Sequence, residues 1–196
     1  MRSVKFLVVV VMMTSALMQA QSTPPFTFTG YGGLFFPSNV HYRETFESTS
    51  DIIWGIGGSY PVLPMLHLSS DLGFFKAEAF HNSTLDSVTT LEEKFIHVGL
   101  INKEYLGQGL FLRLIGGVSF TSIKYEELGP SVPAQSVEAD RKIGYYGGIG
   151  IEELVEGAHF SFFADVVYDY RRVQQRDLAG DFGGLRLVLG VNMIMF

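Results

Sequence analysis

The chain has no cysteine among its 196 residues. This absence excludes a disulfide framework, a thiolate metal site and a lipid anchor on an N-terminal cysteine. Basic residues are also scarce, with 14 lysines and arginines against 20 aspartates and glutamates and a formal charge of −6 at pH 7. Because a negative protein is poorly suited to binding a phosphate backbone, we expect no nucleic-acid partner.

Long apolar runs are missing as well. Beyond the first 20 residues, no stretch approaches the roughly 18 consecutive apolar residues that a membrane-spanning helix requires. Hydrophobic residues nevertheless make up 47% of the chain, while only 17% of residues are charged. This combination excludes a helical membrane protein but is compatible with one that crosses the membrane with alternating strands.

The first residues have the pattern of a secretory signal. Arg2 and Lys5 precede an unbroken apolar run, which gives way to small and polar residues before Ala20. The apolar run is too short to span a membrane as a helix. We therefore expect a signal peptide at 1–20, cleaved after Ala20, a short N-terminal segment at 21–25, and one domain at 26–196.

Apolar and polar residues alternate with a period of two in eight segments of this domain. These predicted strands cover 26–36, 51–60, 66–77, 94–105, 110–124, 142–154, 159–171 and 182–196. The connections are alternately long and short, and the long ones, which we expect to be solvated loops, cover about 37–50, 78–93, 125–140 and 172–181. This rhythm predicts an all-β fold, an eight-stranded antiparallel up-and-down transmembrane β-barrel.

The faces of the predicted strands favour a membrane barrel over a soluble one. In segment 159–171, Phe160, Phe162 and Val166 share one side, whereas Asp165 and Asp169 share the other. A soluble lipocalin-like or jelly-roll barrel would need a charged exterior, but the charged residues here cluster in the predicted loops. Aromatic residues near strand ends would form interfacial girdles: Trp54, Tyr60, Tyr105, Tyr125, Tyr168 and Tyr170.

The mature chain resembles the OmpA/OmpX-type small outer-membrane β-barrel proteins, on the strength of its architecture, its signal and its terminal Phe196. The resemblance implies location in the outer membrane and contact with its lipids and lipopolysaccharide. It also implies that periplasmic chaperones and the barrel-assembly machinery act during biogenesis, with Phe196 as the assembly signal. Counting back by twos, Phe196 is on the same strand face as Ile194 and Asn192, whereas the more uniformly apolar face of this strand is the opposite one. Either a bulge shifts the end of the strand or Phe196 lies off the lipid face.

Charged residues on the inward faces bear on transport. The interior of an eight-stranded barrel is just wide enough for side chains to fill, so we expect these charges to form a lumenal network rather than to line an open pore. Its predicted members are Asp71, Lys103, Arg113, Glu152, Asp165 and Arg186. If the predicted strands 110–124 and 142–154 pair symmetrically about the loop between them, Arg113 lies opposite Glu152. A narrow or gated channel for small solutes is the alternative.

A second alternative is a lipid-A-modifying enzyme. His159 and Ser161 share a predicted inward face with Asp165, which offers a base, a nucleophile and an orienting carboxylate. However, both residues follow a short turn and so lie at the periplasmic end, whereas lipid A occupies the outer leaflet. We therefore expect no catalytic site and no cofactor, and the scattered histidines predict no metal site.

The four long loops remain as the expected working surface. Basic residues of the last loop and its flank, Arg171, Arg172 and Arg176, are predicted to line the outer rim and contact lipopolysaccharide phosphates. The favoured function is a structural or adhesion-like surface-interaction role without an open pore. The sequence identifies no particular extracellular partner.

Overall fold

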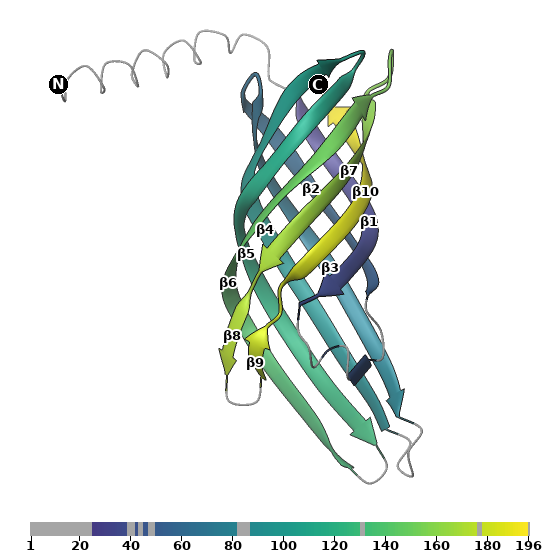
Figure 1. Ribbon diagram of the computed structural model, residues 1–196, viewed down its shortest axis with the longest axis vertical. Helices are drawn as coiled ribbons and strands as arrows, with labels where there is room; N and C mark the ends of the chain where they lie inside the picture. Colours follow the sequence, from purple (N-terminus) through teal and green to yellow (C-terminus); the bar gives the residue numbers. More distant parts are fainter. Residues whose placement is uncertain are drawn as a thin grey trace, which may run out of the picture.

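The computed structural model describes residues 25–38, 42, 45–46, 50–81, 87–129, 132–175 and 178–195. Its ten strands are β1 (Phe26–Pro37), β2 (Asp51–Leu63), β3 (Leu66–His81), β4 (Ser87–Gly107), β5 (Leu110–Gly129), β6 (Val132–Leu154), β7 (Phe160–Tyr170), β8 (Arg172–Gln175), β9 (Leu178–Asp181) and β10 (Gly184–Met195). Eight of them form a closed antiparallel barrel, and β8 and β9 form a separate two-stranded sheet (Figure 1). Within these residues, no helix combines the length and apolarity needed to cross a membrane.

The barrel closes through β1, which pairs with β2 on one side and with β10 on the other. The closing register runs from Phe26 opposite Met195 to Pro37 opposite Gly184 without a shift. Closure gives the backbone donors and acceptors of these strands partners within the sheet, as a hydrocarbon environment demands. The predicted eight-stranded up-and-down barrel is confirmed.

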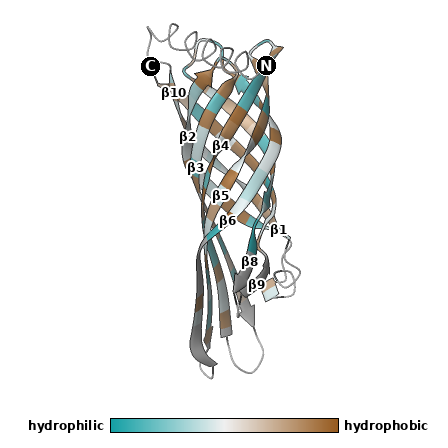
Figure 2. Ribbon diagram, turned by 90° about the vertical axis from the view of Figure 1, so that its left-hand side faces the viewer, coloured by the Kyte–Doolittle hydropathy of each residue, from teal (hydrophilic) through white to brown (hydrophobic). Residues whose placement is uncertain are grey.

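Side chains alternate between the two faces of the wall, as expected from the period of two. In β7, Phe162 and Val166 are exposed on the outside, whereas Phe163 and Asp165 are buried inside. The same alternation holds along β10, and Figure 2 shows it as alternating hydropathy along the strands. Most exposed large side chains on the barrel are apolar, so the outside is built to face lipid.

Three short turns join the strands at the end of the barrel where β1 begins and β10 ends, the upper end in Figure 1. We call this the turn end and the opposite end the loop end. The tight β4–β5 turn requires left-handed backbone at Gly107, Gln108 and Gly109, with φ of 116°, 50° and 80°. Glycine adopts this conformation without steric cost, which explains the two glycines of this turn.

The predicted loops at 78–93 and 125–140 are wrong, because most of these residues belong to paired strands. β3 and β4 pair as far as His81 and Ser87, and β5 and β6 pair as far as Gly129 and Val132. The two hairpins therefore project beyond the other strands at the loop end (Figure 1). Polar outer faces made these segments look like loops. The predicted loop at 172–181 likewise contains the β8–β9 hairpin.

The outward side chains of β2–β5 mark where the apolar band ends. One register row is apolar and consists of Ile56, Leu72, Ile96 and Phe120. The next row toward the loop end is mixed and consists of Trp54, Phe74, Lys94 and Ser122. The row after that is charged and contains Lys76, Glu92 and Lys124. The apolar band therefore ends at the mixed row, and the hairpins continue beyond it.

Candidate functional site

The six charged residues predicted to form one lumenal network lie inside the barrel in two clusters. Lys103, Arg113, Glu152 and Asp165 contact one another toward the turn end. Asp71 and Arg186 lie closer to the loop end, in a second cluster built around His97 and Asp169. We refer to these as the turn-end cluster and the loop-end cluster.

Arg113 is the centre of the turn-end cluster. Its Nη1 lies 2.6 Å from Glu152 Oε2, and its Nε lies 2.9 Å from Asp165 Oδ1. Lys103 Nζ lies 2.8 Å from the same Glu152 oxygen. The Arg113 guanidinium also lies over the Phe163 ring, 4.3 Å from its centroid. Two cations and two carboxylates thus balance in charge, which is the condition under which buried ions are tolerated.

Neutral polar groups extend this cluster to β1. Ser161 Oγ donates a hydrogen bond of 2.6 Å to Glu152 Oε1, and Asn192 Nδ2 donates to Ser161 Oγ at 3.3 Å. Thr29 Oγ1 in turn donates to Asn192 Oδ1 at 2.7 Å. The hydrogen-bonded chain therefore runs along the inner wall over four neighbouring strands, from β6 through β7 and β10 to β1, and it links the first strand of the barrel to the last.

His97 lies between two carboxylates in the loop-end cluster. Its Nδ1 is 3.0 Å from Asp71 Oδ1, and its Nε2 is 2.9 Å from Asp169 Oδ1. With both carboxylates ionised, the two hydrogen bonds form together only when both ring nitrogens carry a proton. Arg186 Nε lies 2.6 Å from the other Asp169 oxygen, and Tyr31 donates its hydroxyl to Asp71 at 2.7 Å.

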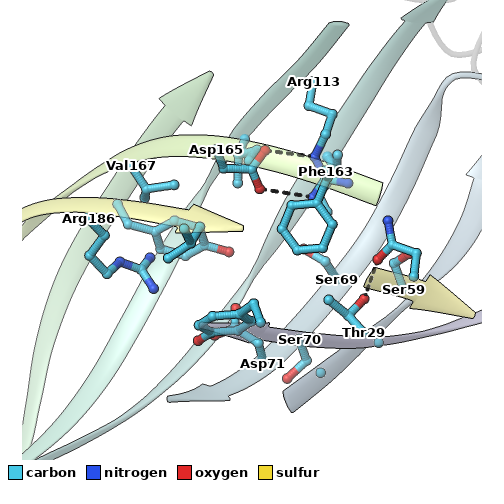
Figure 3. Close-up of a pocket in the computed structure, with 18 residues that line it drawn as sticks. Thr29, Ser59, Ser69, Ser70, Asp71, Arg113, Phe163, Asp165, Val167 and Arg186 are labelled. Atoms are coloured by element: carbon cyan, nitrogen blue, oxygen red, sulfur yellow. Dashed lines mark hydrogen bonds and ion pairs between the residues drawn. The ribbon is translucent and has the colours of Figure 1, made fainter. Parts of the chain in front are cut away.

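A chamber of about 70 Å³ separates the two clusters (Figure 3). Arg113 and Asp165 line it from one cluster, and Asp71 and Arg186 line it from the other. Hydroxyl groups such as that of Thr29 supply much of the remaining polar lining. The volume has room for a few water molecules, and the lining provides the polar partners that buried water needs.

Between the loop-end cluster and the loop end, an apolar core fills the mouth of the barrel. It joins side chains of the β1–β6 walls to Tyr42 and Phe46 of the β1–β2 connection and to Phe182, which follows β9. The Tyr42 ring stacks on Phe46 at 4.8 Å, and the Tyr42 hydroxyl donates to Asp51 Oδ2 at 2.5 Å. Phe35 meets Phe75 edge to face at 5.0 Å. The same core continues along the inner faces of the projecting hairpins, through Ala77, Ala79, Leu91 and Ile123.

Arg171 was predicted to lie on the outer rim, and this is wrong. The residue is completely buried, and its Nη1 donates to Glu93 Oε2 at 2.8 Å. Its inward parity on the strand explains the burial, because Asp169 and Arg171 point the same way. Glu93 lies on the loop side of the apolar band. Burial raises its pKa to about 7, although the Arg171 guanidinium acts to lower it.

The other predicted surface and assembly residues are only partly described. Arg172 begins β8 and is exposed, in agreement with a position at the loop end. Arg176 and Phe196 lie outside the described residues, as do the whole predicted signal peptide and its cleavage site. Of the predicted girdle residues, Tyr125 packs against the inner core of the hairpins, so its assignment is wrong. The other five are exposed.

Sequence reasoning missed His97, Asp169, Glu93, Arg171 and Tyr31 as interior partners. The parity of segments 94–105 and 159–171 already placed three of them inside, so the signal was present. Glu93 was hidden because its segment was predicted to be a loop. The predicted pairing of Arg113 with Glu152 was also wrong in register, since Arg113 faces Gly150 in the ladder. The long side chain reaches Glu152 diagonally instead.

The predicted grouping of His159, Ser161 and Asp165 does not form a catalytic arrangement. His159 precedes β7 and is exposed, whereas the sequence placed it on the inward face. Ser161 is buried and donates its hydroxyl to Glu152, and Asp165 binds Arg113. Within the described residues, no group of three or more histidines and carboxylates is placed to hold a metal ion.

No protein-family model and no curated protein matches the sequence. The fold is similar to Neisserial surface protein A, with 12% identity, a TM-score of 0.57, and coverage of 86% of this chain and 96% of that one. It is similar to a major outer membrane protein from Thermus thermophilus, with 13% identity, a TM-score of 0.58, and coverage of 87% and 99%.

A third similar structure is Ail of Yersinia pestis in complex with the heparin analogue sucrose octasulfate. It has 11% identity, a TM-score of 0.51, and coverage of 88% and 99%. At sequence identities this low, structural similarity establishes the fold but not the function. The chain therefore has the eight-stranded fold of the small outer-membrane β-barrels, and the predicted resemblance to the OmpA/OmpX type is confirmed at that level.

Proposed function

We propose that this protein is an integral outer-membrane barrel with a structural or surface-interaction role and a lumen that does not conduct. In this proposal, residues 1–20 are removed during export and the loop end faces the cell exterior. The observation that carries it is the projection of the β3–β4 and β5–β6 hairpins beyond the apolar band, with inner side chains that join the apolar core of the mouth. Paired strands offer a partner a fixed surface, which mobile loops do not.

The closed lumen is supported by three successive barriers along the barrel axis: the turn-end cluster, the loop-end cluster and the apolar mouth. An ion passing through would have to break buried ion pairs and then cross an apolar layer, and both steps are costly. The chamber between the clusters favours the alternative of a narrow or gated solute path.

The location is tested by cell fractionation and by gel mobility of unboiled and boiled samples. We expect the chain to remain in the outer-membrane fraction after a urea wash, to lack residues 1–20, and to migrate as a compact form before boiling. Release into the soluble fraction would contradict the proposal. Planar-bilayer recordings of the folded protein test the lumen, and discrete, reproducible openings would favour the channel alternative.

The surface role is tested by replacing the projecting hairpins with short turns. The matched control replaces the β8–β9 hairpin alone, which leaves β3–β6 intact. Loss of binding to host cells or serum factors only in the hairpin variants would support an adhesion-like role. On the outward face of the hairpins, Lys76 and Lys124 are paired with Glu78 and Glu126, and Glu92 adds a further negative charge. We therefore do not expect binding of a polyanion such as the one bound to Ail.

Two predicted partners remain part of the proposal. Arg172 and Arg176 are proposed to contact lipopolysaccharide phosphates at the rim. Phe196 is proposed to act as the signal for the barrel-assembly machinery, with periplasmic chaperones acting before insertion. Removing Phe196 would then lower the amount of inserted barrel without changing the stability of the molecules that do fold.

A further inference from the structure

The outward wall of β2 and β3 carries an exposed aromatic pair at the end of the apolar band. Trp54 and Phe74 stack with ring centroids 4.4 Å apart and an interplanar angle of 22°. Trp54 is 53% exposed and is the only tryptophan in the chain. Stacked rings at this level present a flat surface where the hydrocarbon meets the polar region.

Lys94 lies directly beside this pair, opposite Phe74 in the ladder, and its side chain is exposed. Lys76 and Lys124 of the next row each form an ion pair of 2.7 Å with a glutamate of their own strand. No carboxylate in the described part of the chain pairs with Lys94. Among the outward lysines at this boundary, Lys94 is therefore the one available to an external anion.

A groove of about 370 Å³ opens on the same wall, nearer the turn end. Ser70 forms its floor, and the Phe26 ring lies against Gly58, the neighbour of Ser70 in the β2–β3 ladder, and bounds the groove there. Phe28, Ile56 and Leu72 form its sides. The groove is shallow and open to the surroundings, and its lining is mostly apolar, as an acyl chain requires.

Lys94 lies on the strand next to β3, closer to the loop end than the groove is. From Ser70 to Phe74 the chain advances four residues along β3, about 13 Å at the usual rise of a strand. A ligand whose anionic head contacts Lys94 would therefore reach the groove with a single extended fatty acyl chain. The aromatic pair lies in the same register row as Lys94, on the two strands that carry the groove, where a sugar ring can stack on it.

We propose that this wall is a specific binding site for a phosphorylated glycolipid of the lipopolysaccharide type. Lys94 binds a phosphate, Trp54 and Phe74 contact the sugar, and one acyl chain fills the groove over Ser70, beside the Phe26 ring. The proposal rests on the outer-membrane location proposed above, with the loop end outside, because that places the wall in the outer leaflet. Lipid covers any outward wall, and the property specific to this one is recognition of the phosphate.

The test uses Trp54 as its own reporter. The full chain is folded into phosphatidylcholine vesicles, and Trp54 emission is followed while diphosphorylated lipid A, dephosphorylated lipid A or phosphatidylglycerol is added. The phosphate variant is Lys94→Gln, with Lys124→Gln as its matched control one row away. The groove variant is Ser70→Leu, with Gly147→Leu as its control, since Gly147 is exposed on β6, across the barrel. Mobility of unboiled samples verifies that each variant is folded.

We expect a saturable change in emission with diphosphorylated lipid A. We expect its dissociation constant to rise about tenfold in Lys94→Gln and about threefold in Ser70→Leu, with neither control changed. Equal binding of phosphatidylglycerol, equal binding of dephosphorylated lipid A, or an unchanged constant in Lys94→Gln would each overturn the site. Fractionation of cells reports separately on location, so failure of the site and failure of the proposed function give different results.

Discussion

The Nη1 atom of Arg171 lies 2.8 Å from Oε2 of Glu93, although the two residues are 78 positions apart in the chain. Both side chains are only 1% exposed. The guanidinium also lies 5.3 Å from the Phe35 ring centroid and 5.1 Å from that of Phe95. The pair therefore joins β4 to the end of β7 between the apolar mouth and the loop-end cluster.

Replacing Arg171 with methionine is expected to lower the free energy of unfolding by about 3–5 kcal/mol at pH 8, because the Glu93 carboxylate remains buried without its cation. Urea titration of the protein in lipid vesicles measures this. The double variant Arg171→Met/Glu93→Gln leaves no unpaired charge and should regain most of the loss. If the loss of free energy of unfolding in the double variant equals the sum of the losses in Arg171→Met and Glu93→Gln, the two side chains are not energetically coupled.

The raised pKa of Glu93 predicts a dependence of stability on pH. In the folded protein the carboxyl holds its proton up to a pKa of about 7, whereas the ordinary value is 4.5. Between these values the folded state binds more protons than the unfolded chain, so the free energy of unfolding falls as pH rises and levels off above 7. We expect a decrease on the order of 1–3 kcal/mol between pH 5 and pH 8.

The control for this pH dependence is Glu93→Gln, which has no proton to release at this position. Other carboxylates titrate in both proteins, so the difference between parent and variant isolates Glu93. Parallel stability curves for the two proteins would show that Glu93 does not titrate in this range.

The barrel was predictable from the sequence because its wall follows a single rule, the alternation that puts Phe162 outside and Phe163 inside. The ends of the strands were not, because charged residues on the outer face of a hairpin produce the composition of a loop. Lys76 and Glu92 illustrate this: the sequence predicts the first near a strand end and the second in a loop, yet they are neighbours in one ladder. The amino-acid composition of such a segment does not show whether it is paired with a neighbouring strand.

The sequence predicted which charged residues face the interior of the barrel, but not which residues they contact there. Arg113 was placed inside correctly, but its contact with Glu152 depends on the β5–β6 register, which the turn geometry sets. The parity of segment 94–105 placed His97 inside the barrel, but it did not identify the partners of the imidazole. Asp71 faces His97 directly in the β3–β4 ladder, whereas Asp169 of β7 reaches the other ring nitrogen only because the barrel closes.

Two glycines on the barrel wall should respond oppositely to the same substitution. A Cβ at Gly73 would overlap Cε2 of the buried Phe95, so Gly73→Ala should lower the free energy of unfolding by about 1–3 kcal/mol. A Cβ at Gly30 would meet nothing within 4 Å, so Gly30→Ala should have no cost or stabilise slightly. Urea titration in vesicles compares them, and equal effects would contradict the packing of Phe95 against Gly73.

A structural role and a catalytic role of Ser161 predict different effects of substitution on stability and on lipid A. Ser161→Ala removes a hydroxyl that donates to Glu152 and accepts from Asn192, so it should lower the free energy of unfolding by about 1–3 kcal/mol. His159→Ala should leave stability nearly unchanged, because His159 is exposed. Mass spectrometry of lipid A from cells carrying each variant should show the acylation pattern of the parent. A changed pattern in both variants would restore the enzyme alternative, since a purely structural hydroxyl cannot alter the lipid.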